Sequence, residues 1–582
     1  MHVLATAGHV DHGKSTLVRA LTGMEPDRWA EERRRGMTID LGFAWTTLAG
    51  GTTLAFVDVP GHERFVPNML AGIGPVPVAM IVVAADEGWM PQSAEHLAAL
   101  HALGVRHGLL VVTRSDLADP GPARAQALRE IAATSLGDVD SVCVSPVTGA
   151  GLDELRSALG RLVAGLPAPA TGAPVRLWID RSFTIKGAGT VVTGTLGAGR
   201  LRPGDELELT GADRPVRVRG LQSLGVAVDE VTAPARVAVN LRGVDKDAVG
   251  RGRALLTPGR FVLTDLIDVR VHGDPVADLP ATITLHAGSA AVAVHVRPLG
   301  ADTARLRLRT PLPLRIGDRA LLRDPGRHHV AGGVTVLDVV PPGLTRRGAA
   351  AARATELATM DGQPDLAGEL RRRRLVRRDD LTRMGVDPGR DAAPWLADPA
   401  HWAQLRERLA AEVGKHAAAH PLEHGVPVEA LRHLLGLPDR ALVEALVEPP
   451  LTLREGRVSA GTSALPAELV AAIGSAFDAG RPFAAPEANR LTELGLGVRQ
   501  LGAATRAGLI VRLTGTVILP AGAPEQAVRT LAGLPQPFTT SEARQALGTT
   551  RRVVLPLLEH LDSAGVTRRL SDDRRVVVTP PS

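Results

Sequence analysis

Cysteine is almost absent from the 582-residue chain, in which Cys143 is the single example. One cysteine cannot form an internal disulfide, and such a composition is typical of a protein that stays in a reducing compartment. Cys143 lies in the apolar run 139–144, so we interpret it as a small buried residue rather than a nucleophile. A disulfide-stabilised fold is therefore excluded.

Lysine is also scarce, because Lys14, Lys186, Lys246 and Lys415 are the only four in the chain. Arginine consequently carries most of the positive charge. The formal net charge of +5 is modest for this length, and it allows a nucleic-acid partner without requiring one. At 582 residues the chain is long enough for several domains, so a motif in one region need not explain another.

Long apolar runs are lacking as well. The longest uncharged candidate, residues 66–85, is interrupted by three prolines and two glycines, which predicts a short helix, a turn and a buried strand instead of a membrane span. Met1 leads directly into a strand pattern, without the basic segment and apolar core of a signal peptide. We expect a soluble, cytoplasmic protein with no membrane partner.

Residues 8–15 match the phosphate-loop template of a Gly, four residues, and then Gly-Lys-Ser. An apolar strand pattern precedes the loop, and a helix pattern that ends at Gly23 follows it, so backbone N–H groups and the positive end of the helix face a bound anion. Lys14 is predicted to contact the β- and γ-phosphates, and the Ser15 hydroxyl to ligate Mg²⁺. The nucleotide-binding residues predicted here are Gly8, His9, Val10, Asp11, His12, Gly13, Lys14, Ser15 and Thr16.

Short apolar runs recur through the first 165 residues, between stretches of helix length. Uniformly apolar runs in this arrangement predict a parallel sheet covered on both faces, that is, an α/β domain. Ligands of such sheets bind at the carboxyl ends of the strands. The runs are 1–7, 53–57, 78–84, 108–112 and 139–144.

Two further motifs follow strands and suit a nucleotide switch. Asp58, after the strand 53–57, can hold Mg²⁺ through water, and the N–H of Gly61 can meet a γ-phosphate. His62 is the candidate for orienting the attacking water. Thr38, between the phosphate loop and Asp58, is predicted to close over Mg²⁺ and the γ-phosphate, although the charge run just before it would alone indicate a solvated helix face.

Two later loops are predicted to contact the nucleotide base. Thr113, Arg114 and Asp116 follow one strand, and Ser145, Pro146 and Val147 follow the next. The carboxylate of Asp116 can accept hydrogen bonds from the two adjacent N–H groups on the Watson–Crick edge of guanine, for which adenine has no equivalent pair. The prediction is therefore GTP or GDP rather than ATP.

Taken in order, these motifs resemble those of a translational GTPase of the EF-Tu type. The strings 36–44, 58–65 and 84–92 resemble the family of selenocysteine-specific elongation factors (SelB) in particular. Thr113 stands where that wider pattern usually has asparagine, Arg114 where it has lysine, and the stretch 145–147 replaces a Ser-Ala-x stretch. None of these departures removes Asp116.

After the Pro- and Gly-rich linker 167–174, short alternating stretches predict two antiparallel β-barrels. The resemblance implies that aminoacyl-tRNA is gripped across all three domains. It also implies a selenocysteine pocket at Asp180, Arg181 and Arg236. A selenol is ionised at neutral pH whereas a serine hydroxyl is not, so a paired arginine can discriminate between them. The alternative interpretation is that these are rim charges on a barrel.

From about residue 344 the pattern becomes helical and contains a repeat, in which the stretch from Pro482 echoes the stretch from Pro537. Helix, turn, helix and a two-stranded wing predict tandem winged helices. Such repeats can serve as protein-binding spacers, but clustered arginines in the last one favour an RNA hairpin. The predicted RNA-binding residues are Arg544, Arg551, Arg552, Arg568, Arg569, Arg574 and Arg575.

These predictions divide the chain into a GTPase domain (1–168), two barrels (175–258 and 259–342) and four winged helices (343–410, 411–465, 466–522 and 523–582). The expected function is GTP-dependent delivery of selenocysteinyl-tRNA to the ribosome, by a monomer, at UGA codons marked by an mRNA hairpin. Ribosome-stimulated GTP hydrolysis would then release the tRNA. The alternatives are a general translation factor, a GTPase subunit of a metabolic enzyme such as the sulfate-activating complex, and a nucleotide-driven DNA-binding regulator.

Overall fold

The computed structural model describes residues 1–26, 38, 40–62, 65–74, 76–187, 189–327, 329–423, 425–460, 465–515 and 517–578. The strings expected at 36–44 and 58–65 lie partly outside these residues. The chain forms two compact units, 1–396 and 397–582, which are described separately. Within the described ranges, no helix is long and apolar enough to cross a membrane.

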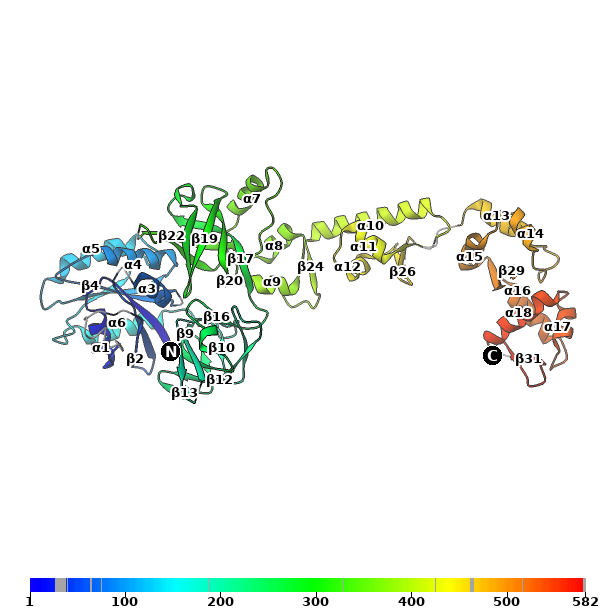
Figure 1. Cartoon of the computed structure of the whole chain (residues 1–582). Helices are drawn as coiled ribbons and strands as arrows, with labels where there is room; N and C mark the ends of the chain where they lie inside the picture. The colour runs from blue at the N-terminus through cyan, green and yellow to red at the C-terminus, as the bar shows by residue number, and fades with distance from the viewer. Residues whose placement is uncertain are drawn as a thin grey trace. The chain divides into compact units, whose positions relative to one another are not determined.

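The first part of unit 1 is a six-stranded sheet in the order β2-β3-β1-β4-β5-β6 (Figure 1). Five strands are parallel, as the apolar runs predict, and β2 is an added antiparallel edge strand on β3. The strands are β1 (His2–Ala7), β2 (Gly42–Thr47), β3 (Thr53–Asp58), β4 (Val78–Ala84), β5 (His107–Thr113) and β6 (Asp140–Cys143).

Helices cover both faces of this sheet. One hydrophobic cluster joins the sheet to α3, α4 and α5, and a second joins its other face to α1 and α6. The uncharged stretch at 66–85 is a helix, a turn and a buried strand, as predicted. The helices are α1 (Lys14–Thr22), α3 (Val66–Ile73), α4 (Pro91–Ala102), α5 (Pro120–Ala132) and α6 (Leu152–Ala164).

The next β domain is antiparallel, with the strand path β7-β16-β11-β12-β15-β9-β8 around its own apolar core. The main-chain N–H of Asp180 donates to Thr193 O at 3.0 Å and links the end of β7 to β9. The elements are β7 (Arg176–Trp178), β8 (Arg181–Ile185), β9 (Gly189–Leu196), β10 (Arg200–Leu201), β11 (Glu206–Leu209), β12 (Val216–Ser223), β13 (Val226–Val228), β14 (Val231–Thr232), β15 (Ala235–Arg242), η2 (Lys246–Ala248) and β16 (Ala254–Leu256).

The second β domain is a closed barrel in the order β17-β20-β19-β18-β21-β22. The C-terminal end of α4 packs against it, and a Cβ added at Gly333 would lie 2.2 Å from Ala102 O, so only glycine permits this approach. The elements are β17 (Val262–Gly273), η3 (Val276–Asp278), β18 (Thr282–Ala287), β19 (Ala290–Pro298), β20 (Thr303–Leu314), β21 (Arg319–Asp324) and β22 (His329–Asp338).

A small helical segment completes unit 1 and shares the hydrophobic cluster of the closed barrel through Val376, Leu381, Met384 and Val386. Its elements are α7 (Ala349–Ala358), α8 (Leu366–Arg373), β23 (Leu375–Arg377), α9 (Arg378–Met384) and β24 (Trp395–Ala397). In this segment β23 and β24 pair with each other and form a two-stranded sheet in the place of the predicted wing.

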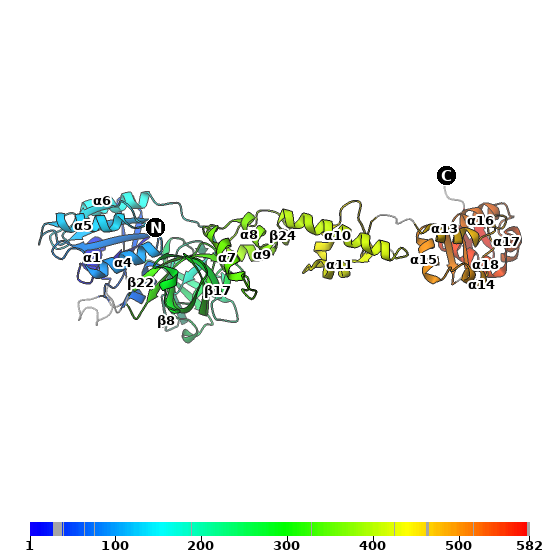
Figure 2. The same ribbon diagram turned by 90° about the horizontal axis from the view of Figure 1, so that it is seen from above.

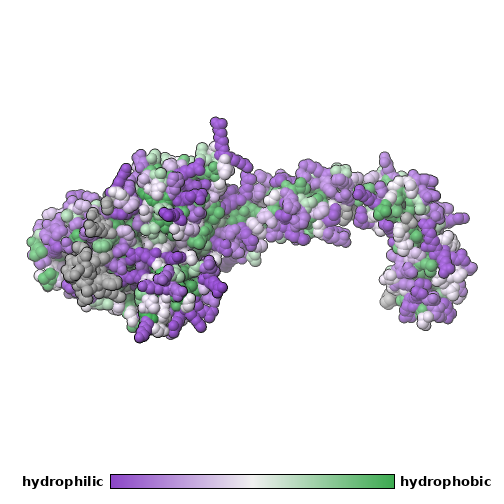
Figure 3. All heavy atoms as spheres, in the orientation of Figure 1, coloured by the Kyte–Doolittle hydropathy of each residue, from purple (hydrophilic) through white to green (hydrophobic). Residues whose placement is uncertain are grey.

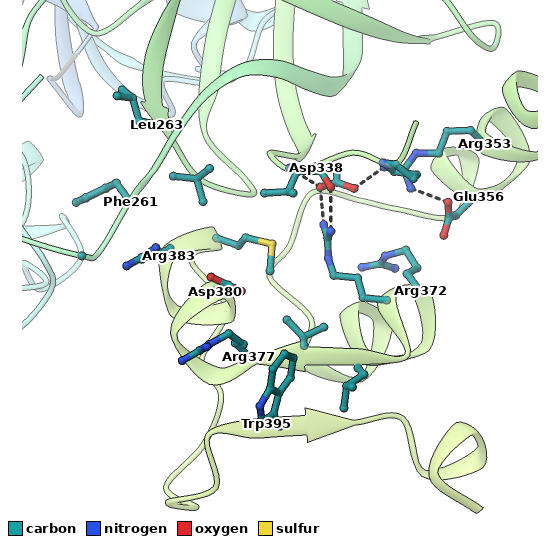
Figure 4. Close-up of a pocket in the computed structure, with 18 of the residues that line it drawn as sticks. Phe261, Leu263, Asp338, Arg353, Glu356, Arg372, Arg377, Asp380, Arg383 and Trp395 are labelled. Carbon is teal, nitrogen blue, oxygen red and sulfur yellow. Dashed lines mark hydrogen bonds and ion pairs between the residues drawn. The ribbon is translucent and has the colours of Figure 1, made fainter. Parts of the chain in front are cut away.

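A buried ion-pair network fastens this segment to the barrel. Arg353 of α7 is 3% exposed and donates to Asp268 at 2.7 Å and to Asp338 at 2.6 Å. Figure 4 shows it between Asp338 and Glu356, at the edge of a cavity of about 850 Å³ that lies between the barrel and the helices. Arg305 and Arg373 pair with the same two aspartates, so each buried carboxylate has two cationic partners.

Unit 2 contains three helix-and-hairpin segments. α10 (Pro399–Ala419) runs through the boundary that the sequence places between residues 410 and 411, so a domain limit at that point would divide one helix. The first segment continues with β25 (Val426–Pro427), α11 (Val428–Leu435), α12 (Arg440–Leu446), β26 (Thr452–Arg454) and β27 (Arg457–Ser459).

The last two segments have the predicted order of helices followed by a two-stranded wing. Their helices α13 to α18 lie together in one group (Figure 2). The repeated residues Phe483 and Phe538 are both buried, and they share one core cluster, so these two segments pack against each other. Their elements are α13 (Ala467–Ser475), α14 (Ala488–Glu493), α15 (Val498–Arg506), β28 (Ile510–Thr514) and β29 (Val517–Pro520), then α16 (Ala523–Ala532), α17 (Thr540–Ala546), α18 (Arg551–Ser563), β30 (Thr567–Arg569) and β31 (Arg575–Val577).

Candidate nucleotide-binding site

The phosphate loop lies between β1 and α1. Gly13, with φ 80°, precedes Lys14, the first residue of α1. Lys14 is 6% exposed, and its Nζ donates to Gly8 O at 3.0 Å and to His9 O at 2.6 Å. Burial lowers the pKa of this ammonium to about 8. The loop therefore holds one cation against its own carbonyl groups, next to the N-terminus of a helix.

Three predicted residues from distant parts of the chain meet beside this loop. Ser15 Oγ donates to Asp58 Oδ2 at 2.6 Å and lies 2.9 Å from Thr38 Oγ1. Thr6 Oγ1 donates to the other oxygen of Asp58, at 2.7 Å, and fixes this fully buried carboxylate. Two hydroxyls and a carboxylate form the hard oxygen set that suits Mg²⁺.

Gly61 and His62 lie at the same place. A Cβ added at Gly61 would be 2.5 Å from Lys14 Nζ and 2.6 Å from Val10 N, so glycine is required for this close approach to the phosphate loop. The ring of His62 lies 5.9 Å from that of Phe65, at a tilt of 55°. Thus the switch motif reaches the loop that would hold the phosphates.

Helix α4 contributes two contacts to the loop that the sequence interpretation missed. His96 Nδ1 accepts from Gly8 N at 2.9 Å, and Gln92 Oε1 accepts from Val10 N at 3.2 Å. Complete burial lowers the pKa of His96 to about 3, so it stays neutral and can accept. Their spacing of four residues on one helix was the available signal, but it does not identify a partner about 80 residues away.

His12 is a second buried histidine of the loop. Its Nδ1 lies 3.2 Å from Val82 O, and burial lowers its pKa to about 4. The carbonyl of His12 also accepts from Thr113 Oγ1 at 2.8 Å. The threonine that departs from the family pattern therefore ties the first base loop directly to the phosphate loop.

The other residues of the two base loops differ in their exposure to solvent. Asp116 is exposed, Val147 is 84% exposed, and buried Ser145 shapes its own loop by accepting from Thr148 N at 3.1 Å. Arg114 forms ion pairs with Asp86 at 2.9 Å and Glu87 at 2.7 Å. Thr16 lies exposed on α1, and Pro146 is half-buried.

The residues of the implied selenocysteine pocket lie where the first β domain, which holds β7 to β16, meets β2. Arg181 and Arg236 line a cavity of about 200 Å³ together with Phe43, Trp45 and Phe183. Asp180 is 4% exposed, and it accepts from Arg236 Nη2 at 2.7 Å and from Thr193 Oγ1 at 2.7 Å. Asp180 thus holds Arg236 in place, and the two arginines carry the positive charge of the cavity.

The seven C-terminal arginines are not equivalent. Arg551 and Arg568 are exposed, Arg544 is half-buried, and among the described residues none of the three has an ion-pair partner. Figure 3 shows a largely hydrophilic surface over the C-terminal segments on the face drawn.

The other four arginines already have partners. Arg575 is 4% exposed and donates to Asp562 at 2.8 Å, which makes it part of the interior. Arg552 pairs with Glu487 at 2.9 Å, Arg569 with Asp573 and Arg574 with Asp572. Cys143 is half-buried, so it is less buried than its place in an apolar run predicts, and burial raises the pKa of its thiol.

A mostly parallel sheet with a phosphate loop, followed by two antiparallel β domains, is the architecture of the class of translational GTPases. The family description "Elongation factor Tu GTP binding domain" matches residues 1–164, and "Elongation factor Tu domain 2" matches residues 189–256. "Selenocysteine-specific elongation factor, beta-barrel domain" matches residues 267–343, and "Elongation factor SelB, winged helix" matches residues 529–576.

Individual proteins agree with these matches. The chain is 35% identical to the selenocysteine-specific elongation factor of Desulfomicrobium baculatum, over 65% of this chain and 62% of that protein. For the Escherichia coli selenocysteine-specific elongation factor the identity is 38%, over 60% and 56% of the two chains. Elongation factor Tu 2 of Streptomyces avermitilis is 33% identical over 58% of this chain and 96% of its own length. The chain thus spans about three fifths of the two selenocysteine-specific relatives that it matches.

Solved structures extend the likeness to the whole chain. A crystal structure of a bacterial selenocysteine-specific elongation factor covers 100% of both chains with a TM-score of 0.77 and 25% identity. Translation elongation factor SelB of Methanococcus maripaludis, in complex with the GTP analogue GppNHp, covers 58% of this chain and 79% of its own, with a TM-score of 0.52. The chain belongs to the elongation factor Tu family, and its residues 267–343 and 529–576 match the models of selenocysteine-specific elongation factors.

Proposed function

We propose that this protein is a GTP-dependent factor that delivers selenocysteinyl-tRNA to the ribosome at UGA codons marked by an mRNA hairpin. The observation that carries the proposal is the small cavity where Arg181 and Arg236 meet the aromatic ring of Phe43. Two guanidinium groups and an aromatic wall suit a small, polarisable anion such as a selenolate, and they give a neutral serine hydroxyl no comparable stabilisation.

The nucleotide site works as a switch in this proposal. Lys14 and the loop amides bind the phosphates of GTP, Gly61 offers its N–H to the γ-phosphate, and Asp116 selects guanine. The oxygens of Ser15, Thr38 and Asp58 fit Mg²⁺, which would neutralise charge on the phosphates. His62 orients the attacking water when the ribosome stimulates hydrolysis, and the loss of the γ-phosphate releases Thr38 and Gly61.

The exposed arginines of the last winged helix bind the backbone of the mRNA hairpin. Arg551 lies at the first turn of α18 and Arg568 in the wing, the two elements with which winged helices contact nucleic acid. The partners of this function are the tRNA, the ribosome and the hairpin, which place the protein in the cytoplasm, and a monomer suffices for all three.

The test measures binding of selenocysteinyl-tRNA and of seryl-tRNA that carries the same tRNA body, each with a non-hydrolysable GTP analogue. We expect a clear preference for the selenocysteinyl form, and we expect Arg236→Met to abolish it. Equal affinity of the wild-type protein for both tRNAs, or for ordinary elongator aminoacyl-tRNAs, would sink the proposal and favour a general translation factor.

A further inference from the structure

Thr38 and residues 40–43 form a segment of the GTPase domain that touches both the nucleotide site and the cavity at Arg181 and Arg236. At its start, Thr38 Oγ1 lies 2.9 Å from Ser15 Oγ. Two residues later, Asp40 pairs with Arg181 at 2.8 Å and with Arg251 at 2.8 Å. Both arginines belong to the first β domain, so this segment bridges the two domains.

Phe43, the last residue of the segment, lines the cavity. The guanidinium carbon of Arg236 lies 3.8 Å from the centre of the Phe43 ring, and that of Arg181 lies 5.2 Å from it. A cation that close to an aromatic face is attracted by the ring's quadrupole. The ring is 9% exposed, so water competes little with these contacts.

Phe43 lies on β2, which pairs with β3, and β3 ends at Asp58 of the nucleotide site. In the β2–β3 ladder, Phe43 lies opposite Val57, and Gly42 lies opposite Asp58. A shift of β2 would therefore move the Phe43 ring relative to Asp58, whose oxygens accept from Ser15 and Thr6.

Among the described residues, three guanidinium groups and two carboxylates meet at this boundary. Arg181, Arg236 and Arg251 supply three guanidinium groups, and Asp40 and Asp180 supply two carboxylates. Burial opposes ionisation of Asp40, but the charge of Arg181 and the hydrogen bond from Arg251 outweigh it and lower the pKa of Asp40.

We propose that Asp40 and Phe43 are positioning residues that make the selenolate cavity part of the nucleotide switch. When the segment is held at Ser15, Asp40 orients Arg181, and the ring of Phe43 orients both cavity arginines. When Thr38 leaves the nucleotide site, these contacts separate and the cavity loses its shape. This inference rests on the proposed function and assigns the coupling between its two sites to named side chains.

The experiment measures the dissociation constant of selenocysteinyl-tRNA with the GTP analogue and with GDP, in the full-length protein. We expect Asp40→Asn and Phe43→Leu to reduce the ratio of the two constants by about tenfold or more, since a coupling of about 1.4 kcal/mol corresponds to a factor of ten. Linkage requires that the tRNA-dependent gain in GTP affinity fall by the same factor. GDP affinity without tRNA should stay unchanged, because these contacts are absent from the GDP-bound arrangement.

Two variants separate positioning from simple structural damage. Phe43→Tyr keeps an aromatic face and should retain the wild-type ratio, because stacking rather than volume is required. Glu206→Gln removes a carboxylate from an exposed pair with Arg217 on the same β domain and should have no effect.

An unchanged ratio in Asp40→Asn and Phe43→Leu would overturn this inference alone. Equal loss in Phe43→Leu and Phe43→Tyr, or loss of GDP binding in Asp40→Asn, would do the same by showing general damage. A wild-type protein that does not distinguish selenocysteinyl-tRNA from seryl-tRNA would instead refute the proposed function, and the inference with it.

Discussion

Single residues at the nucleotide site are already held by one another. Asp58 accepts from both Thr6 and Ser15, and Lys14 donates to two loop carbonyls. Such mutual bonds fix the side chains in advance, so little entropy is lost when phosphate oxygens arrive. Catalysis at this site therefore depends on the few groups that face the γ-phosphate.

Replacing His62 with alanine separates nucleotide binding from hydrolysis. The variant should bind GTP with the affinity of the wild type, because the phosphate loop and the base loops are unchanged. Its ribosome-stimulated hydrolysis should fall by roughly 10²–10⁴-fold, the usual contribution of a side chain that positions or deprotonates a nucleophile. Phosphate release in single-turnover assays checks this. Wild-type hydrolysis in the variant would assign water positioning to another group.

At the residue scale, local motifs predicted the site better than they predicted its supports. Thr38, Ser15 and Asp58 do come together, as the order of the phosphate loop, the threonine after it and the Asp58 motif suggested. Asp40 and His96 were missed, because their partners lie 141 and 88 residues away in the sequence, and no spacing rule spans such distances.

Helix α4 is the element that joins the phosphate loop to the closed barrel. His96 and Gln92 hold loop amides, and Glu95 on the same helix pairs with Arg323 of β21 at 3.2 Å. Apolar residues of α4 pack on the sheet, and the three polar residues that make these contacts all lie in the first half of the helix.

Burial of His96 should make the GTPase domain sensitive to acid. Its pKa is about 3 in the fold and 6.5 when solvated, so unfolding takes up a proton below pH 6.5, and the stability it contributes is lost as the pH falls toward 3. Between pH 7 and pH 5 this amounts to about 2 kcal/mol. His96→Gln keeps an acceptor for Gly8 N and should remove this part of the pH dependence.

Hydrogen exchange of the β1 and β4 amides, corrected for intrinsic rates, reports the opening free energy at each pH. His12, whose pKa is lowered to about 4, still titrates in the variant, so some acid sensitivity should remain. An identical pH dependence in the variant and the wild type would show that His96 is not the responsible group.

Helix α7 is fastened by charge rather than by an apolar face alone. Arg353→Met should lower the free energy of local opening of α7 by about 3 kcal/mol, because Asp268 and Asp338 each lose one of two cationic partners while buried. Exchange of the α7 amides measures this. Arg371→Met, whose side chain is 68% exposed and lies 3.8 Å from Asp365, is the matched control and should change little.

Elements were predicted most accurately where burial alone determines them. The strand at 78–84 and the helix that ends at Gly23 follow from continuous apolar runs and a left-handed C-cap. The edge strand β2 and the course of α10 were not predicted, because an edge strand carries a weaker pattern and α10 continues through an alanine-rich stretch without a break.

The whole molecule places its two predicted recognition functions in separate compact units. The nucleotide site and the selenocysteine cavity lie in unit 1, and the arginines of the last winged helix lie in unit 2. Within unit 1 the domains are connected by specific pairs, such as Arg176 with Asp318 between the two β domains, whose nitrogen and oxygen are 2.7 Å apart. Each unit has its own hydrophobic clusters, so each can keep its binding function when the other is impaired.

Two single substitutions in the full-length chain test this separation. Lys14→Ala should abolish GTP binding, because the phosphates lose their buried cation, and it should leave binding of the mRNA hairpin unchanged. Arg551→Ala should weaken hairpin binding and lower the slope of log K against log salt by about one, while GTP affinity stays at the wild-type value.

The controls are exposed residues of the same type in the same domains or their neighbours, Lys186→Ala and Arg529→Ala, and both should behave as the wild type. Fluorescent-nucleotide titration and filter binding of a labelled hairpin give the two readouts on each protein. If Lys14→Ala also lost the hairpin, or Arg551→Ala also lost GTP, the sites would be parts of one cooperative structure. Independent losses would show that each site binds its own ligand without needing the other site intact, as expected of two compact units with separate hydrophobic clusters.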